Sequence, residues 1–531
     1  MNRSKCAPNE GAKPEGDVPE EVVPEATGPE EGEGSTPSGA DFLQLDPAQA
    51  PRGGRADWLA ERLRAAIGDG RLPVGARLPP TRVLAADLRL SRGVVTAAYQ
   101  RLVEDGHVAG RGRAGTVVVA APPTTGAAAP APAPPPEAAQ PADPFAGEPD
   151  GAVFERLRGA PARIDLTPGV PDLAAFPRAA WLRAERAVLA RLSAADLGYG
   201  DPRGAPALRA AVVRWLARNR GVRADPGEVI VVSGVAQALG LVAQVLGEEG
   251  VRRVGVEDPG SLGVRQHLAR AGMAVAPLPV DAEGVSATAL AESGVGAAVL
   301  TPAHQFPTGV VLSAARRGAL ARWARGGGIV VEDDYDAEHR YGRPPAPALR
   351  SVLPESTCYT GSVSKLLAPA LRLGWLLVPP RLHAAAVAAK RFADLGSAVL
   401  PQLVLAHLMD SGDLERHLRT VRRRHRRRRD AMVAALAAHL PDAAVHGAAA
   451  GLHLLVTLPP GAADTALASA CLERGVKVQP LSWHTQRPQP PGLVLGYGAR
   501  TATEITEGVA AVGAALRALR PRRGGRDNGQ G

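Results

Sequence analysis

The chain has 531 residues, of which 45% are hydrophobic and 22% charged, an ordinary globular composition with room for several domains. Its three cysteines exclude a disulfide scaffold and offer no metal-ligand spacing, so we expect no metal site and a reducing, cytoplasmic setting. The sequence shows neither a secretory signal nor a stretch that reads as a membrane span. The net charge of +9 suits an acidic partner such as nucleic acid, although it does not identify one.

Charge and composition change along the chain and predict five regions. Residues 1–50 hold eleven acidic and three basic residues, which indicates a disordered acidic tail. Residues 51–120 hold twelve arginines and six acidic residues, which indicates a small basic domain. An Ala/Pro-rich linker is expected over 121–162. A large globular domain is expected over 163–518, followed by a second disordered tail over 519–531.

The basic domain reads as three helices and a hairpin. The first helix is predicted by an apolar stripe formed by Leu59, Leu63 and Ile67. Thr81 is expected to cap a second helix, and Ser91 a third helix over 92–104. Residues 107–119 read as a hairpin with a basic, Gly-rich tip. These elements predict a winged helix-turn-helix.

A winged helix places its recognition helix in the major groove of DNA, N-terminal end first. That end carries Ser91, Arg92 and Thr96, and the wing would bring Arg111 and Arg113 to phosphates or to the minor groove. Two alternatives stay open at this stage. The winged helix could serve protein contacts, or its arginines could be solvated surface groups in a chain with few lysines.

The stretch 75–108 resembles the GntR-type winged helix of bacterial regulators, and the resemblance extends over 55–120. It implies a dimer bound to a two-part operator in double-stranded DNA.

Several segments of the large domain carry candidate chemistry. Residues 229–232 read as a buried strand, and Gly234, Val235 and Ala236 then open a helix whose free N–H groups and dipole suit a phosphate. Alone this signal is weak, since a glycine between strand and helix is commonly a turn. The loop 301–309 is held rigid by two prolines and a glycine, and its polar groups could line the same pocket.

A second apolar strand, 329–331, ends in the acidic cluster 332–336. Open α/β sheets bind ligands at the carboxyl ends of their strands, so this cluster predicts a site. A metal site or simple loop acids remain as alternatives.

Lysine is scarce in this chain. Outside the N-terminal tail the only lysines are Lys365, Lys390 and Lys477. Lys365 follows a strand and a hydroxyl-rich turn containing Ser362, and Arg372 comes seven residues later, so these groups could hold a phosphate beside the amine. A Schiff-base lysine needs a lowered pKa, and the cofactor chemistry needs an acid at the pyridine nitrogen. Asp333 is the best candidate for that acid.

Together these segments resemble fold-type I aminotransferases and, more closely, the MocR-type regulators, which fuse a GntR winged helix to an aminotransferase-like domain. The strings TPAHQFPTG (301–309), VEDDYDAEHRYGRP (331–344) and YTGSVSKLLAPALRLGWLLVP (359–379) carry the resemblance over about 55–518. It implies an α/β domain with a mostly parallel sheet and a smaller C-terminal α/β subdomain.

The resemblance also implies the site. By it, Lys365 carries pyridoxal 5′-phosphate as an aldimine, Asp333 pairs with the pyridinium nitrogen and Tyr335 with the ring hydroxyl. By the same resemblance, the phosphate is held by Gly234, Val235, Ala236, Ser362, Arg372 and, from the partner subunit of a homodimer, Tyr199. Arg500 is the candidate for an effector carboxylate. Ser261 and Ala236 depart from the family pattern, which leaves open what stacks on the ring and how the phosphate is gripped.

The sequence thus favours a cytoplasmic, pyridoxal-phosphate-dependent transcriptional regulator that senses an amine or amino-acid effector, or the cofactor itself. A working aminotransferase with an accessory DNA-binding domain is the alternative, and a DNA-binding module with a cofactor-free large domain is a third. The arginine run 416–429 is expected to be an exposed helix with Leu418 and Val421 facing inward, rather than a second DNA contact.

Overall fold

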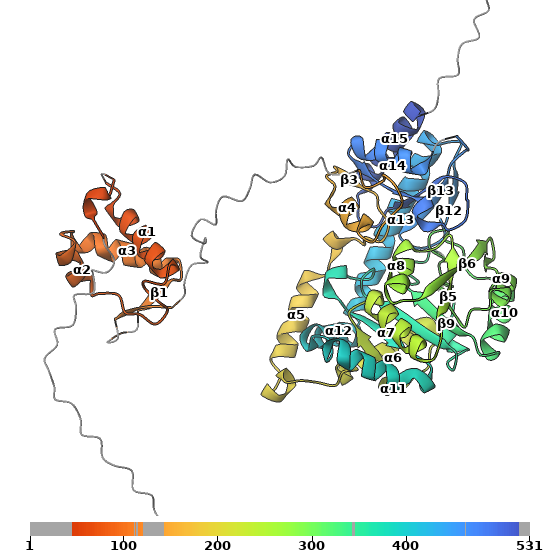
Figure 1. Cartoon of the computed structure of the whole chain (residues 1–531), viewed down its shortest axis with the longest axis horizontal. Helices are drawn as coiled ribbons and strands as arrows, with labels where there is room; N and C mark the ends of the chain where they lie inside the picture. Colours follow the sequence, from red (N-terminus) through yellow and green to blue (C-terminus); the bar gives the residue numbers. More distant parts are fainter. Residues whose placement is uncertain are drawn as a thin grey trace, which may run out of the picture. The chain divides into compact units, whose positions relative to one another are not determined.

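The computed structural model describes residues 45–51, 53–110, 112, 115–119, 143–341, 346–461 and 463–519. The two wing arginines, Arg111 and Arg113, lie outside the described residues, as do most of both predicted tails and the Ala/Pro-rich part of the predicted linker. The chain divides into two compact units, residues 1–139 and 140–531 (Figure 1).

The first unit contains the predicted three helices and hairpin. They are α1 (Arg55–Gly68), α2 (Thr81–Asp87), α3 (Arg92–Glu104), β1 (Val108–Gly110) and β2 (Thr116–Val118). The two strands pair antiparallel, and the predicted stripe Leu59, Leu63 and Ile67 is fully buried in one core with α3 and the hairpin. Ser91 caps α3, its hydroxyl accepting from Val94 N at 3.4 Å. Thr81 does not cap α2: it is the first helical residue, and Pro80 stands at the cap position.

The second unit is built on an eight-stranded sheet in the order β4-β11-β10-β9-β8-β5-β6-β7. The strands are β4 (Ile230–Val232), β5 (Arg253–Asp258), β6 (Ala274–Asp281), β7 (Gly284–Val285), β8 (Ala297–Leu300), β9 (Ile329–Asp334), β10 (Thr357–Ser362) and β11 (Gly374–Leu377). Strands β10, β9, β8, β5 and β6 run parallel, while the strands at the two ends of the sheet pair antiparallel. The predicted mostly parallel α/β fold is confirmed.

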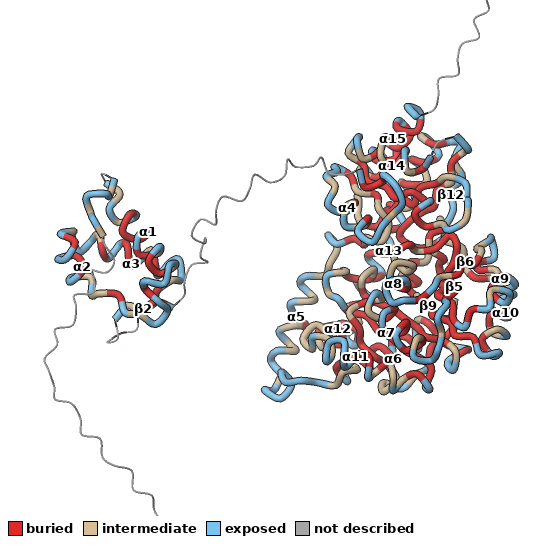
Figure 2. Tube along the Cα trace, viewed as in Figure 1, coloured by how far each residue is buried: buried red, intermediate tan, exposed pale blue. Residues whose placement is uncertain are grey.

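Apolar side chains on both faces of this sheet are buried, which is why its strands read as continuous apolar runs. Val229 and Val231 pack into one core, and Ile230 and Val232 into another on the opposite face, as strand alternation requires. The surrounding helices are α5 (Arg178–Leu189), α6 (Pro206–Arg220), α7 (Val235–Glu248), α8 (Leu262–Arg270), α9 (Ala287–Glu292), α10 (Ala314–Arg325), α11 (Pro380–Asp394) and α12 (Val399–Asp410). Figure 2 shows the buried strands enclosed by these helices.

A smaller C-terminal subdomain completes the unit. Its strands are β12 (Ala444–His446), β13 (His453–Thr457), β15 (Gln479–Pro480) and β16 (Gly492–Gly496), which form an antiparallel sheet, and β14 (Val476–Lys477), which pairs parallel with β3 (Ile164–Asp165). Its helices are α14 (Asp464–Glu473) and α15 (Ala502–Leu519), and α13 (Asp413–His439) runs to it from the sheet-bearing lobe (Figure 1).

The predicted linker extends too far, because residues 143–162 are largely folded. They include α4 (Val153–Gly159), whose Val153 and Leu157 are buried in the core of the C-terminal subdomain. Phe145 stacks on Trp483 with 5.4 Å between ring centroids. Apolar residues spaced four apart on a helix find a partner surface more than 300 positions away in the chain, which composition alone did not reveal.

The arginine run forms one half of α13, with Leu418 and Val421 buried as expected. The run is not purely solvent-facing, however. Arg424 and Arg428 make ion pairs with the buried carboxylate of Asp172 at 2.7 and 3.1 Å, so part of the positive charge holds the fold together. Among the described helices, none has both the length and the apolar character required to cross a membrane.

Candidate functional site

The second unit contains a cavity of about 700 Å³ between the large sheet and the C-terminal subdomain. Its walls come from segments spread over more than 300 residues of sequence. The polar and charged lining residues are Arg158, Asp165, Thr167, Ser261, Thr301, Asp333, Tyr335, Ser362, Ser364, Lys365, Arg372, His453, Lys477, Gln479 and His484. The cavity therefore collects both the groups that the sequence singled out and several that it did not.

One end of the cavity is shaped to take an anion. Val235 and Ala236 line it at the first turn of α7, where backbone N–H groups lack helical partners. Gly234 precedes them with φ 90°, and an added Cβ there would meet the Arg372 guanidinium at 3.4 Å. Arg372 itself donates to the carbonyl of Ser233. The positive φ, which residues with a side chain rarely adopt, explains why a glycine stands at the turn, and the contact shows that Arg372 reaches the helix start.

Lys365 lies three residues beyond the end of β10, and its amine lines the same cavity. Nζ donates to the carbonyl oxygen of Gly169, in the loop after β3. Burial lowers the pKa of Lys365, while the negative charges of Asp336 and Asp333 act in the opposite direction. A buried amine with a lowered pKa is suited to nucleophilic chemistry.

Asp333 lies near the end of β9 and faces the cavity. Burial, together with the neighbouring carboxylates of Asp334 and Asp336, raises its pKa to about 7. Its Oδ1 atom is buried without a hydrogen-bond partner. A buried acceptor without a partner costs free energy, so a cationic or N–H donor in the cavity would be stabilised there.

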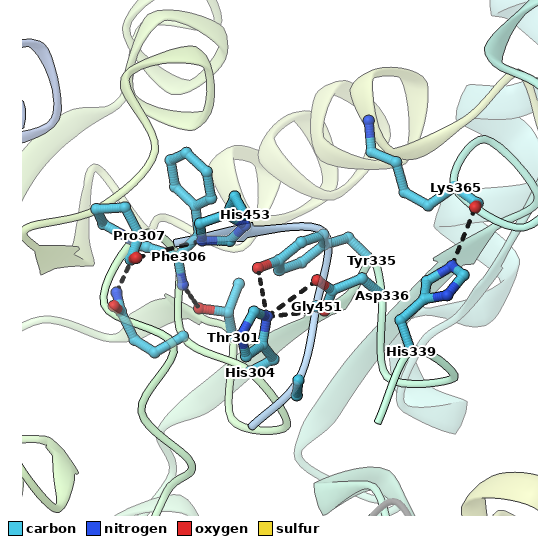
Figure 3. Close-up of polar contacts among 12 residues, drawn as sticks. Thr301, His304, Phe306, Pro307, Tyr335, Asp336, His339, Lys365, Gly451 and His453 are labelled. Carbon is cyan, nitrogen blue, oxygen red and sulfur yellow. Dashed lines mark hydrogen bonds and ion pairs between the residues drawn. The ribbon is translucent and has the colours of Figure 1, made fainter. Parts of the chain in front are cut away.

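A hydrogen-bonded network lies beneath Tyr335 (Figure 3). His304 Nδ1 lies 3.0 Å from the Tyr335 hydroxyl and 2.9 Å from Asp336 Oδ2. Burial opposes ionisation of Asp336, but His304 holds the pKa of that carboxyl below its ordinary value. Burial and the charges of Asp336 and Asp333 raise the pKa of Tyr335 well above its ordinary value. The tyrosine is therefore kept protonated and fixed in position.

His304, Asp336 and His453 bring their ligand atoms within 4.8 Å of one another, close enough for a metal ion. Two of these atoms already have partners within the protein. His304 Nδ1 is bonded as described, and His453 Nε2 lies 3.2 Å from the Pro307 carbonyl oxygen. Burial, with a contribution from His304, lowers the pKa of His453 to about 3. Because both nitrogens already have partners within the protein, the arrangement favours a hydrogen-bonded network over a metal centre.

In the first unit, the predicted DNA-contacting residues share the exposed side of α3. Ser91, Arg92 and Thr96 are exposed, while Val95 and Leu102 are buried on the other side of the helix. The start of the recognition helix is therefore free to enter a groove.

Comparisons with known proteins agree with this geometry. Residues 162–510 match the family "Aminotransferase class I and II", and residues 55–118 match "Bacterial regulatory proteins, gntR family". A probable rhizopine catabolism regulatory protein MocR from Rhizobium meliloti is 33% identical over 87% of this chain and 93% of its own length. The chain belongs to the MocR-type regulators.

Other MocR-type relatives include the pyridoxine biosynthesis regulator PdxR from Corynebacterium glutamicum, which is 30% identical over 83% of this chain and 91% of its own length. Among solved structures, the α-aminoadipate aminotransferase LysN from Thermus thermophilus, complexed with N-(5′-phosphopyridoxyl)-L-leucine, has a TM-score of 0.63 at 28% identity. The match covers 69% of this chain and 94% of the LysN chain. The chain is thus a transcriptional regulator with a GntR winged helix and a fold-type I aminotransferase-like domain.

Two predicted residues of this MocR-type chain do not reach the cavity of their own subunit. Tyr199 is 95% exposed. Arg500 donates to the Asp165 carbonyl at 3.3 Å and lies 3.6 Å from Glu504, and it is absent from the cavity lining. Ser261 does line the cavity and caps α8, so a hydroxyl stands where the family pattern has an aromatic ring.

Sequence reasoning missed several lining residues. His453, Lys477, Gln479 and His484 come from the C-terminal subdomain, and Arg158 comes from the segment assigned to the linker. The scarcity of lysine could have pointed to Lys477, because a lysine in the folded part of such a chain is a candidate for a functional role. Nothing in the local sequence around the other four indicated a site.

Proposed function

We propose that this regulator binds pyridoxal 5′-phosphate in the cavity, through Lys365, and responds to an amine or amino-acid effector by changing how its winged helices engage an operator. We place it in the cytoplasm, where operator DNA is found. The observation that carries the proposal is the unpartnered Oδ1 of Asp333 in the cavity that also holds the Lys365 amine.

The residues present fit the cofactor. Asp333 would offer its free acceptor to a protonated ring nitrogen, and the Tyr335 phenol, which lines the same cavity, would serve as a hydrogen-bond partner for the ring hydroxyl. The helix start at Val235 and Ala236, with Ser362 and Arg372, suits the phosphate. When bound, pyridoxal phosphate supplies an electrophilic carbonyl carbon and a ring that withdraws electrons from it.

The protein's own groups set the protonation of the site. Burial and the negative charge of Asp336 raise the pKa of Tyr335 and hold its proton at the phenol oxygen, while burial lowers the pKa of Lys365 and keeps its amine ready to lose a proton. Burial is the main cause that lowers the pKa values of His453 and His484 to about 3. Both side chains therefore contribute neutral rings to the cavity wall.

An effector amine would compete with the Lys365 amine, and the displaced Nζ has a partner available in the Gly169 carbonyl. Gly169 follows β3 in the chain, and β3 follows α4, the first helix of the second unit. Effector binding can shift the regulator between two arrangements only if it interacts unequally with them. This change of partner at Lys365 supplies such a difference.

We also propose a homodimer. Four large side chains on α5 and the turn after it are 47–95% exposed, namely Leu182, Leu189, Leu197 and Tyr199, and Phe392 is 86% exposed at the end of α11. Exposed apolar side chains gathered on neighbouring segments are typical of an interaction surface. A partner subunit on this surface would give Tyr199 a site to reach, and a dimer matches a two-part operator.

The deciding experiment is borohydride fixation of the purified protein after incubation with pyridoxal phosphate, followed by peptide mapping. We expect a visible absorption band and a label on Lys365. Lys390 and Lys477 are internal controls, because they are the other lysines of the described residues. A label on either of them, or no label, would refute the cofactor assignment.

The alternative of a working aminotransferase is favoured by the intact set of Lys365, Asp333 and Arg372 around one cavity. A 2-aminoadipate transaminase from Thermus thermophilus is also 31% identical over 68% of this chain. An assay that supplies an amino donor and a keto acid distinguishes the enzyme from the regulator. Sustained turnover at ordinary enzyme rates would favour the enzyme, and single-turnover behaviour the regulator.

A further inference from the structure

The cavity lining holds two cationic residues that are not needed by the proposed cofactor. Four of its lining residues are Lys or Arg and only two, Asp165 and Asp333, are carboxylic acids. Under the proposed function, Lys365 and Arg372 serve the cofactor. Lys477 and Arg158 then remain as cations without a stated role.

Lys477 is a buried amine with no counter-charge. It is 6% exposed, and the one described hydrogen bond of its side chain runs from Nζ to the Arg158 carbonyl at 2.9 Å. It makes no ion pair with any described carboxylate. The other two lysines differ: Lys390 pairs with Asp394 at 2.5 Å, and Lys365 is assigned to the cofactor. A buried, uncompensated ammonium is costly unless an anion joins it.

The acid nearest in the fold does not neutralise this amine. Asp165 stands opposite Lys477 in the parallel β3–β14 pair, but its Oδ1 accepts from Thr167 N at 2.9 Å and from the Thr167 hydroxyl at 2.6 Å. Nζ retains two further N–H donors for a ligand.

Arg158 adds a second free cation at the same end. It stands on α4, is exposed, and lines the cavity, and its guanidinium makes no ion pair or hydrogen bond with a described residue. Because the Lys477 amine holds the Arg158 carbonyl, the two residues are tied together. Phe154 and Leu157 of α4 line the cavity beside them and provide an apolar wall.

We propose that Lys477 and Arg158 form the anion subsite of the effector pocket, so that the effector is an amine that also carries a carboxylate or similar anion. Its amine lies toward Lys365 and its carbon chain along α4. This inference rests on the proposed function and adds the class of effector. It also replaces Arg500 as the carboxylate partner, since Arg500 is absent from the cavity lining.

The location gives the subsite a means of signalling. The segment from α4 to Gly169 contacts both ends of the pocket: Arg158 at the anion end, and the Gly169 carbonyl at the Lys365 amine. A ligand that bridges the two ends therefore contacts the first folded segment of the second unit, which leads along the chain to the DNA-binding unit.

The test compares unbranched amino acids, from β-alanine to 6-aminohexanoate, with alkylamines of equal carbon number. Binding is followed by the change in the visible cofactor band and by calorimetry. Wild type should prefer one or more amino acids over the matching amine by about tenfold to a hundredfold, the effect of a charge-assisted hydrogen bond. Lys477→Met should abolish that preference while leaving amine binding unchanged, and Lys477→Arg should retain most of it.

Arg158→Met should reduce the preference severalfold, and it serves as the decisive variant should Lys477→Met fail to fold. Arg156→Met is the matched control, because Arg156 lies on the same helix, pairs with Asp150 at 2.8 Å and is absent from the cavity lining. We expect no effect from it. Unchanged preference in Arg158→Met and in any folded Lys477→Met would overturn the subsite, as would equal effects of Arg156→Met and Arg158→Met.

Glutarate, which has no amine, separates this inference from the cofactor assignment. Calorimetry with the cofactor-free protein should show glutarate binding that weakens about tenfold in Lys477→Met. A wild-type protein without any cofactor band defeats the proposed function, yet the glutarate measurement still decides the subsite. Two outcomes would defeat only the subsite while the cofactor band is normal. In one, wild type does not bind glutarate; in the other, wild type and Lys477→Met bind it equally well.

Discussion

The two functional regions of this regulator are built in opposite ways. On α3, the candidate DNA contacts Ser91, Arg92 and Thr96 lie within six positions of one another and face outward. In the cavity, Arg158 and Lys477 are neighbours although 319 positions separate them, and both line its wall. The candidate DNA-contact surface is a local property of one capped helix, whereas the proposed effector pocket exists only when the large domain has folded.

The largest expected effect comes from Lys365→Ala, which removes the one amine assigned to the cofactor. We expect complete loss of the borohydride-fixed label and of the effector response, with operator affinity largely retained, because no core residue of the first unit comes from the large domain. Operator affinity and reporter output, with and without candidate amines, measure both properties. An intact effector response in this variant would show that the lysine is not the sensor.

Leu63→Ala tests whether destabilising the first unit leaves the stability of the large domain unchanged. Leu63 is fully buried in the core of the first unit, so its truncation should destabilise that unit by about 2–5 kcal/mol. Thermal unfolding should show a lowered transition for the winged helix and an unchanged transition for the aminotransferase-like domain. A matching shift in both transitions would show that the units fold as one.

Asp333→Asn tests whether a buried carboxyl group of the cavity makes the stability of the large domain depend on pH. The pKa of Asp333 is raised to about 7 in the folded protein, against about 4 in an unfolded chain. The folded state therefore keeps a proton that the unfolded state loses between these values, so stability falls as pH rises through this window and levels off above about pH 7. Urea unfolding of the cofactor-free protein at pH 5 and pH 8 should show a difference that shrinks by a few kcal/mol in Asp333→Asn. An equal difference in both proteins would assign the effect to other buried acids, such as Glu257, whose pKa burial also raises to about 7.

The smallest effect is expected from Arg92→Ala on the exposed helix. Loss of a base contact should weaken operator binding by about 1–3 kcal/mol and weaken binding to random DNA less. Loss of a phosphate contact would instead weaken both equally and lower the log–log salt slope by about 0.9. Titrations on both DNAs at several salt concentrations distinguish these outcomes.

The sequence by itself determined whatever depends on short spacing. The stripe of Leu59, Leu63 and Ile67, the Ser91 cap and the limits of α3 followed from helical periodicity and capping. Lys365 and Asp333 could be selected because each follows a recognisable strand, and parallel strands bring their carboxyl ends to one edge of a sheet.

Only the tertiary structure decided which distant groups meet. It paired His304 with Asp336 beneath Tyr335, folded 143–162 against Trp483, and brought Lys477 to α4. It also left Arg500 outside the cavity lining, although its position near the C-terminus had suggested a ligand contact. These contacts join segments whose local sequences are compatible with many partners, and packing and the pairing of buried polar groups select one of them only in the assembled fold.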